Sequence, residues 1–168
     1  GPTPPSGPGD WARPEQRHLY GLLPPSISHE GYSDKPAYSY WDNFWALIGY
    51  QDAAWLADAV GDAAAHERLA RQRDEFAHDL YASLRATAVI HDIPFIAGAA
   101  DRGDFDATST TIALAPGREA RRLPRDLLLA TFERYWDEFD ARRSGGKSWD
   151  AYTPYELRVA GSFIRLGW

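Results

Sequence analysis

Residues 38–45 read Tyr-Ser-Tyr-Trp-Asp-Asn-Phe-Trp and open the clearest helical pattern in the chain. From there, apolar side chains recur at positions 41, 44, 45, 48, 55, 56 and 59, the spacing of one face of an α-helix. We therefore predict a helix from about Trp41 to Val60. Gly61 ends the pattern and Asp62 is a favoured N-cap, so a second helix is expected over about residues 63–90. The two helices should form an antiparallel hairpin with a very short turn.

The second half of the chain contains two further helical patterns. One runs over about residues 125–142. The other follows Thr153-Pro154-Tyr155-Glu156, which has the form of a capping box with Pro at the first helical position, and continues to about Leu166. Residues 91–123 show no clear period and are expected to form a long irregular segment, and no strand is predicted. The predicted fold class is all-α, built from antiparallel helical hairpins.

Composition narrows the classes of partner. The 168 residues carry a formal net charge of −6, which disfavours nucleic acid as a partner. One basic cluster lies between the second and third predicted helices, but acidic residues interrupt it, so it is interpreted as a solvated helix entry. Its members are Arg118, Arg121, Arg122 and Arg125, with Glu119 among them and Asp126 directly after them.

Other classes of site are also disfavoured by residue content. The absence of Cys excludes disulfides and thiolate metal sites, and the five His residues do not group at ligand spacing, so neither a metal nor another cofactor is predicted. No apolar run approaches the roughly 18 residues of a membrane span, so no membrane partner is expected. No signal peptide is visible, and the compartment stays open. Residues 1–14, rich in Pro and Gly, are predicted to be a linker or tag remnant, and residues 15–168 one domain.

The opening segment has the chemistry of a carbohydrate site. A sugar ring has an apolar face that stacks on an aromatic ring and a rim of hydroxyls that a carboxylate accepts from, and such sites need few, fixed polar groups. The loop just upstream, His29-Glu30, can fold over the same place. The candidate sugar-binding residues are Tyr40, Trp41, Asp42, Trp45, His29, Glu30 and, beside a later carboxylate, Arg158. The alternative is that Trp41 and Trp45 share a stripe with Ile48 and belong to the core.

The same segment resembles a known family. Gly31-Tyr32 followed by residues 38–45 resembles the glycine-then-Tyr-x-Trp-Asp-x-Tyr-Trp signature of trehalases and the Gly-His-x-Phe-Trp-Asp segment of disaccharide phosphorylases. Both belong to the six-hairpin, or α/α-toroid, glycosidases. In that superfamily the Trp-Asp pair lies at the inner end of a barrel helix and holds the non-reducing sugar. The resemblance implies this role for Trp41 and Asp42.

A second segment supplies candidate catalytic carboxylates. Gly103-Asp104-Phe105-Asp106-Ala107-Thr108-Ser109-Thr110 resembles the Gly-Trp-Asp-x-Ser-Ser loop of trehalases, whose Asp is the catalytic acid. The resemblance implies Asp106 first and Asp104 second. One extra residue follows the Gly and no Arg follows the Ser/Thr pair, so the choice between them stays open. Without the resemblance, an Asx-turn or helix N-cap is the better interpretation of these residues.

Glu156 is the third catalytic candidate, because glycoside hydrolysis uses two carboxyl groups that flank the scissile bond. The capping box fully explains a Glu at this position, and that alternative is favoured.

Length conflicts with a complete toroid. Twelve helices with their loops need on the order of 250–400 residues, whereas four helices are predicted in this chain. We therefore expect part of a barrel whose exposed faces favour a homo-oligomer. Two function classes follow. The first is a fragment of a glycoside hydrolase-like protein that acts on or binds an α-linked glucoside or related carbohydrate, and is itself inactive. The alternative is a non-catalytic helical module that binds carbohydrate or protein.

Overall fold

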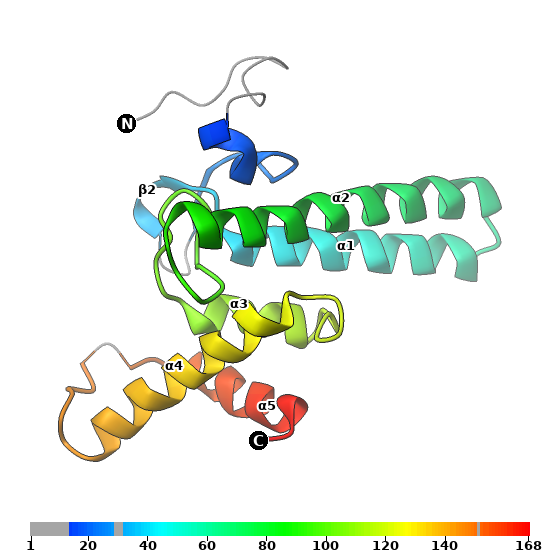
Figure 1. Cartoon of the computed structure of the whole chain (residues 1–168). Helices are drawn as coiled ribbons and strands as arrows, with labels where there is room; N and C mark the ends of the chain where they lie inside the picture. The colour runs from blue at the N-terminus through cyan, green and yellow to red at the C-terminus, as the bar shows by residue number, and fades with distance from the viewer. Residues whose placement is uncertain (1–13, 29–31, 151) are drawn as a thin grey trace.

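The computed structural model describes residues 14–28, 32–150 and 152–168, and these are mainly α-helical (Figure 1). A 3-10 helix, η2, and a two-stranded antiparallel sheet precede five α-helices. Their bounds are η2 Pro14–Leu19, β1 Ser26–Ser28, β2 Tyr32–Ala37, α1 Tyr40–Ala59, α2 Ala63–Ile90, α3 Ala107–Leu114, α4 Arg125–Arg143 and α5 Glu156–Leu166. The predicted all-α class is confirmed.

Helices α1 and α2 form the predicted antiparallel hairpin (Figure 1). The Asp62 carboxylate caps α2 by accepting a hydrogen bond from the backbone amide of Ala65 at 2.9 Å, as a favoured N-cap residue does. Between the helices, Phe44 and Leu47 of α1 and Leu80 and Leu84 of α2 are almost fully buried. The exposed side of α1 departs from the predicted stripe, since Trp55 and Leu56 at its far end are mostly exposed.

The short sheet is a correction to the prediction of no strand. Strands β1 and β2 pair antiparallel with Ser26 opposite Ala37. Strand β2 has the sequence Tyr-Ser-Asp-Lys-Pro-Ala, and Asp, Lys and Pro are depleted in strands. Pairing and the burial of Ala37 against Ala99 compensate for that weak local propensity.

Helix α3 is a second correction, because residues 91–123 were expected to be irregular. Seven of its eight residues are buried, namely Ala107, Ser109, Thr110, Thr111, Ile112, Ala113 and Leu114. A helix buried all round has no polar face, so it carries no 3.6-residue period to detect. The Asp106 N-cap is the one local signal that marks its start.

Helices α4 and α5 pack through aromatic side chains. Phe163 of α5 lies 5.8 Å from Phe132 and 5.7 Å from Trp136 of α4, measured between ring centroids. On the other side of α5, Leu157 and Ile164 are 78% and 76% exposed, respectively. The predicted capping box is wrong in detail: α5 begins at Glu156, its N-cap is Tyr155, and no side chain caps it.

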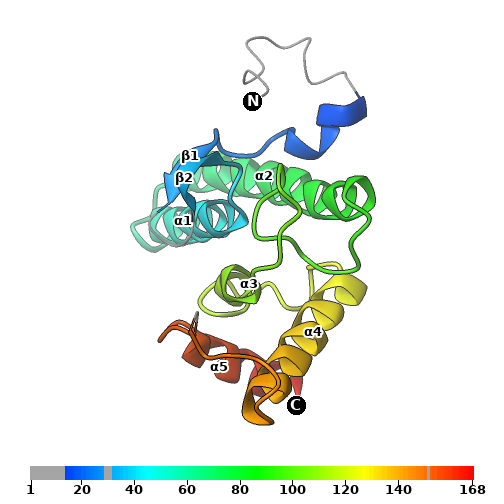
Figure 2. The same ribbon diagram turned by 90° about the vertical axis from the view of Figure 1, so that its left-hand side faces the viewer.

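Three helices start on the same side of the molecule. Helix α3 contacts both α1 and α5, and all three begin on the left in Figure 1, the side on which the β1–β2 hairpin also lies. Figure 2 views that side directly, with α3 between α1 and α5. Side chains in the first turns of three helices are thereby brought to one end of the domain.

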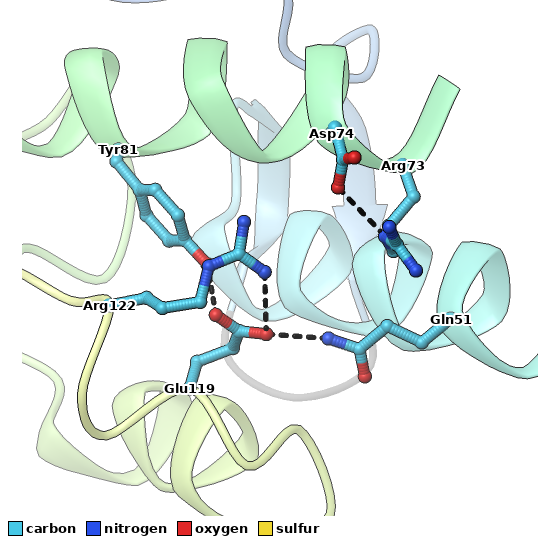
Figure 3. Close-up of polar contacts among 6 residues, drawn as sticks. All are labelled: Gln51, Arg73, Asp74, Tyr81, Glu119 and Arg122. Carbon is cyan, nitrogen blue, oxygen red and sulfur yellow. Dashed lines mark hydrogen bonds and ion pairs between the residues drawn. The ribbon is translucent and has the colours of Figure 1, made fainter. Parts of the chain in front are cut away.

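Glu119, in the segment between α3 and α4, forms hydrogen bonds with both helices of the α1–α2 hairpin (Figure 3). Its buried carboxylate accepts a hydrogen bond from Gln51 Nε2 of α1 at 2.6 Å and another from the Tyr81 hydroxyl of α2, while Arg122 Nη1 lies 3.6 Å away. Burial and then the Glu119 carboxylate raise the pKa of Tyr81. The interpretation of this segment as solvated is therefore wrong for Glu119.

Replacing Glu119 with Gln should lower the free energy of unfolding by about 1.5–3 kcal/mol, because hydrogen bonds to a buried charged acceptor are lost. The control is Arg122→Gln, whose guanidinium is 47% exposed and should cost at most about 1 kcal/mol. Denaturant unfolding measures both variants. Equal losses would contradict a central role for the buried carboxylate.

Candidate functional site

The site is organised by the first turn of α1. Ser39 is its N-cap, with the backbone amide of Asp42 donating to Ser39 Oγ at 3.4 Å. The backbone amide of Tyr40 donates to the carbonyl of Gly98 at 2.9 Å, which joins the helix start to the segment before α3. Trp41 and Asp42 follow directly, so their positions depend on this junction.

An aromatic cluster, defined here as Trp41, Trp45, Tyr155 and Arg158, joins α1 to α5. The ring centroids of Trp45 and Tyr155 each lie 6.3 Å from that of Trp41. The Arg158 guanidinium lies 4.9 Å from the centroids of both Trp41 and Tyr155, within the range of a cation–π interaction. Trp45 is 42% exposed. The structure thus brings together three predicted binding residues and adds Tyr155, which was considered only as part of the cap of α5.

Asp42 is half-buried, and only one of its two carboxylate oxygens accepts a hydrogen bond from the described residues. Its Oδ2 accepts a hydrogen bond from Ser26 Oγ of β1 at 2.5 Å. Its Oδ1 takes no hydrogen bond from the residues that the structure describes. The first turn of a helix favours an anion, so the position suits a carboxylate that accepts from a ligand hydroxyl.

Tyr40 corrects the predicted set of binding residues. Its side chain is fully buried, and its hydroxyl lies 2.8 Å from both Ser83 Oγ and Thr87 Oγ1 of α2. Burial raises the pKa of this hydroxyl. The prediction that Tyr40 binds a ligand directly is wrong, because successive helical residues point about 100° apart. Tyr40 therefore enters the core while Trp41 reaches the surface.

The segment before α3 lies beside the start of α1. An isolated bridge pairs Ser39 with Ala99, and a second pairs Ala97 with Phe105. Two bridged spacings of about 4.8 Å, with an offset of two residues along the middle segment, place the backbone of Phe105 roughly 12 Å from that of Ser39. Asp104 belongs to this junction, because its Oδ1 accepts from the backbone amide of Ala99 at 3.1 Å.

Asp106 is the N-cap of α3. Its Oδ1 accepts from the backbone amide of Thr108 at 2.9 Å, that of Ser109 at 3.3 Å, and the Thr108 hydroxyl at 2.5 Å. Its Oδ2 accepts from the Ser109 hydroxyl. The arrangement agrees with the N-cap alternative, and the carboxylate stays half-buried at the surface.

Glu156 lies apart from the other two carboxylates. It is half-buried, and its carboxylate interacts with the Tyr135 hydroxyl of α4. Burial, followed by Glu156 and Tyr152, raises the pKa of Tyr135. The structure therefore directs Glu156 towards α4, whereas Arg158 of the same helix contacts Trp41. His29 and Glu30 lie outside the described residues.

The described part of the chain offers no group of three or more His, Cys, Asp or Glu side chains suited to a metal ion. None of its helices is long and apolar enough to cross a membrane. Comparisons with protein-family models, curated proteins and solved structures find no match. The side chains at the starts of α1 and α5 supply aromatic faces, a carboxylate oxygen of Asp42 that can accept a hydrogen bond, and the Arg158 guanidinium group as a donor. The carboxylates of Asp104 and Asp106 lie in the neighbouring segment before α3.

Asp106→Ala should lower the free energy of unfolding by about 1–2 kcal/mol, because α3 loses its cap. Asp106→Ser should recover most of that loss, since Ser is also a good N-cap. The control, Asp62→Ala, removes the exposed cap of α2 and should cost less, about 1 kcal/mol or below. Thermal unfolding measures all three, and an Asp106→Ala loss no larger than that of Asp62→Ala would contradict the capping role.

Proposed function

We propose that this chain binds a carbohydrate at the starts of α1 and α5 and belongs to a glycoside hydrolase-like protein acting on an α-linked glucoside or related sugar. The observation that carries the proposal is the aromatic cluster beside Asp42. An exposed aromatic face, a carboxylate acceptor and a guanidinium donor are the complementary groups for a sugar ring and its hydroxyls.

Each group has a distinct role in the proposed complex. Trp45 offers the stacking surface, since it is the more exposed of the two Trp rings, while Arg158 covers part of Trp41. Asp42 Oδ1 accepts from a sugar hydroxyl, and the charge of the carboxylate strengthens that hydrogen bond. Arg158 has no ion-pair partner among the described residues, so its N–H groups are available to sugar oxygens.

Hydrolysis would use the carboxylates before α3. A general acid must give a proton to the leaving oxygen, and Asp106 or Asp104, from the segment bridged to the start of α1, is proposed for that step. The fold arrangement supports the toroid resemblance, because α1, α3 and α5 begin at one end, where the helices of such a barrel carry the site (Figure 1).

A non-catalytic carbohydrate-binding module is the second candidate. It is favoured by the four hydrogen bonds that Asp106 accepts, since they engage both oxygens of its side chain in capping α3. It is also favoured by the orientation of Glu156 towards Tyr135, away from Trp41.

Binding of trehalose and maltose, followed by calorimetry, tests the shared part of both candidates. Trp45→Ala should weaken binding at least about tenfold, the equivalent of roughly 1.4 kcal/mol, because the stacking surface is removed. Asp42→Asn should weaken it similarly, because a charged acceptor is lost.

Trp55→Ala is the matched control, since Trp55 is a 70% exposed Trp on the same helix, far from Asp42. Its binding should be unchanged. Equal effects at Trp45 and Trp55, or no saturable binding of either disaccharide, would refute a carbohydrate site at the start of α1.

Hydrolysis by the isolated chain is expected to be weak or undetectable. Glu156, the third catalytic candidate, is directed towards Tyr135 and not towards Trp41, and general acid–base assistance is worth about 10²–10⁴-fold in rate. Release of nitrophenol from an aryl α-glucoside measures this. Ready turnover that Asp106→Asn abolishes, with binding retained, would overturn this expectation and exclude the non-catalytic candidate.

A further inference from the structure

A second site is indicated at the opposite ends of α3 and α5. There the protein surface is hollowed into an open cavity of about 400 Å³. Its lining combines an apolar floor from the end of α3 with two arginines: Leu114, Ala115, Pro116, Arg118 and Arg165. None of the five is acidic, so the cavity holds two positive charges without a lining carboxylate.

The two arginines form no ion pair with a described carboxylate, as is also true of Arg17, Arg68, Arg121, Arg125 and Arg158. Nine ion pairs join Lys or Arg to carboxylates within the described residues, and neither Arg118 nor Arg165 takes part in any of them. Glu119, the neighbour of Arg118, turns its carboxylate inward to Gln51 and Tyr81. Neither guanidinium group is therefore paired with a described carboxylate, even though the whole chain carries a net charge of −6.

The backbone holds Arg118 at the cavity edge. The amides of Gly117, Arg118 and Glu119 donate to carbonyls in the last turn of α3, at 2.9, 3.3 and 2.8 Å, which folds the chain back on the helix end. A Cβ on Gly117 would lie 2.7 Å from the Ala113 carbonyl oxygen, so this return requires glycine. Arg118 itself has φ +60°, which side-chain-bearing residues seldom adopt.

Helix ends explain part of this arrangement. The carbonyl end of a helix favours a cation, and both arginines lie near such ends. A helix dipole is equivalent to only about half a charge at each end, so it does not explain why two guanidinium groups line one cavity. Each guanidinium group also has five N–H donors, most of which an interaction with a helix end leaves unused. A bound anionic ligand would explain why both arginines line the same cavity.

We propose that this cavity binds a small molecule that carries a phosphate group, held by the guanidinium groups of Arg118 and Arg165. Arginine donates paired hydrogen bonds in a planar fork that matches phosphate oxygens. A phosphate monoester carries about −1.5 to −2 charges at pH 7, which balances two guanidinium groups better than a single carboxylate does. The apolar floor suits the uncharged part of such a ligand.

The test uses phenyl phosphate, with phenyl sulfate as a probe of equal shape and lower charge and with inorganic phosphate as the anion alone. Calorimetry at constant ionic strength should give tighter binding of phenyl phosphate than of either comparison probe. Shifts of backbone amide NMR signals should be centred on Leu114, Ala115, Gly117, Arg118 and Arg165.

Arg118→Gln and Arg165→Gln should each weaken phenyl phosphate binding at least about tenfold, as expected for loss of a charge-assisted contact. Arg118→Lys and Arg165→Lys should weaken it less, because they keep the charge without the fork. Arg121→Gln, which removes an arginine of the same segment outside the cavity lining, should change it less than about twofold.

Several results would overturn the proposal. Equal weakening by Arg121→Gln would indicate diffuse surface charge, and equal affinity for phenyl sulfate would refute selection of a dianion. Absence of saturable binding would refute the site itself. The carbohydrate site lies at the other ends of these helices, so failure of one proposal leaves the other standing.

Discussion

The arrangement of the domain depends on the hydrogen bonds of the buried Tyr40 hydroxyl with α2. This hydroxyl is shared with Ser83 and Thr87 of α2, while the backbone amide of Tyr40 donates to the carbonyl of Gly98. One residue thus joins α1 to α2 through its side chain and to the segment before α3 through its main chain. Because the hydroxyl is buried and satisfied, rotation of the first turn of α1 would leave polar groups unpaired in the core. The outward directions of Trp41 and Asp42 follow from that constraint.

The same junction explains why residues 91–106 are ordered without regular structure of their own. The bridge from Ser39 to Ala99 and the one from Ala97 to Phe105 carry the pairing forward to Asp106, where α3 begins. Gly103, at φ +63°, lies so close to the His91 ring that a Cβ would approach it to 2.4 Å. The segment therefore places the short, buried α3 between α1 and α5, and the three helix starts at one end.

A helix of this chain could be predicted from the sequence only where one of its faces is polar and exposed to solvent. Helix α2, with polar residues on its outer side, was predicted with its bounds correct, and Gly61-Asp62 marked the turn. Helix α3 was not predicted because it has no solvent-exposed polar face. Strand β2 was not predicted because several of its residues disfavour strands. Within the candidate site, Trp41, Asp42, Trp45 and Arg158 were identified by residue type. The burial of Tyr40 and the inward turn of Glu119 depend on which side of the backbone meets a neighbour, and residue type does not specify that.

Helix polarity accounts for the contrast between the two ends of the α1, α3 and α5 layer. Asp42, Asp106 and Glu156 lie at the helix starts, whereas Arg118 and Arg165 lie near the ends of α3 and α5. Partial positive charge at a helix start favours an anion, and partial negative charge at its end favours a cation. The starts therefore favour groups that accept hydrogen bonds from hydroxyls, and the ends favour groups that donate to oxyanions. The proposed phosphate site therefore depends on the two guanidinium groups, since the dipole at a helix end favours the arginines but not the phosphate anion itself. Proton donation from Asp106, by contrast, would work against both the dipole and the cap, so a catalytic role requires a bound sugar to displace at least one of its four hydrogen bonds.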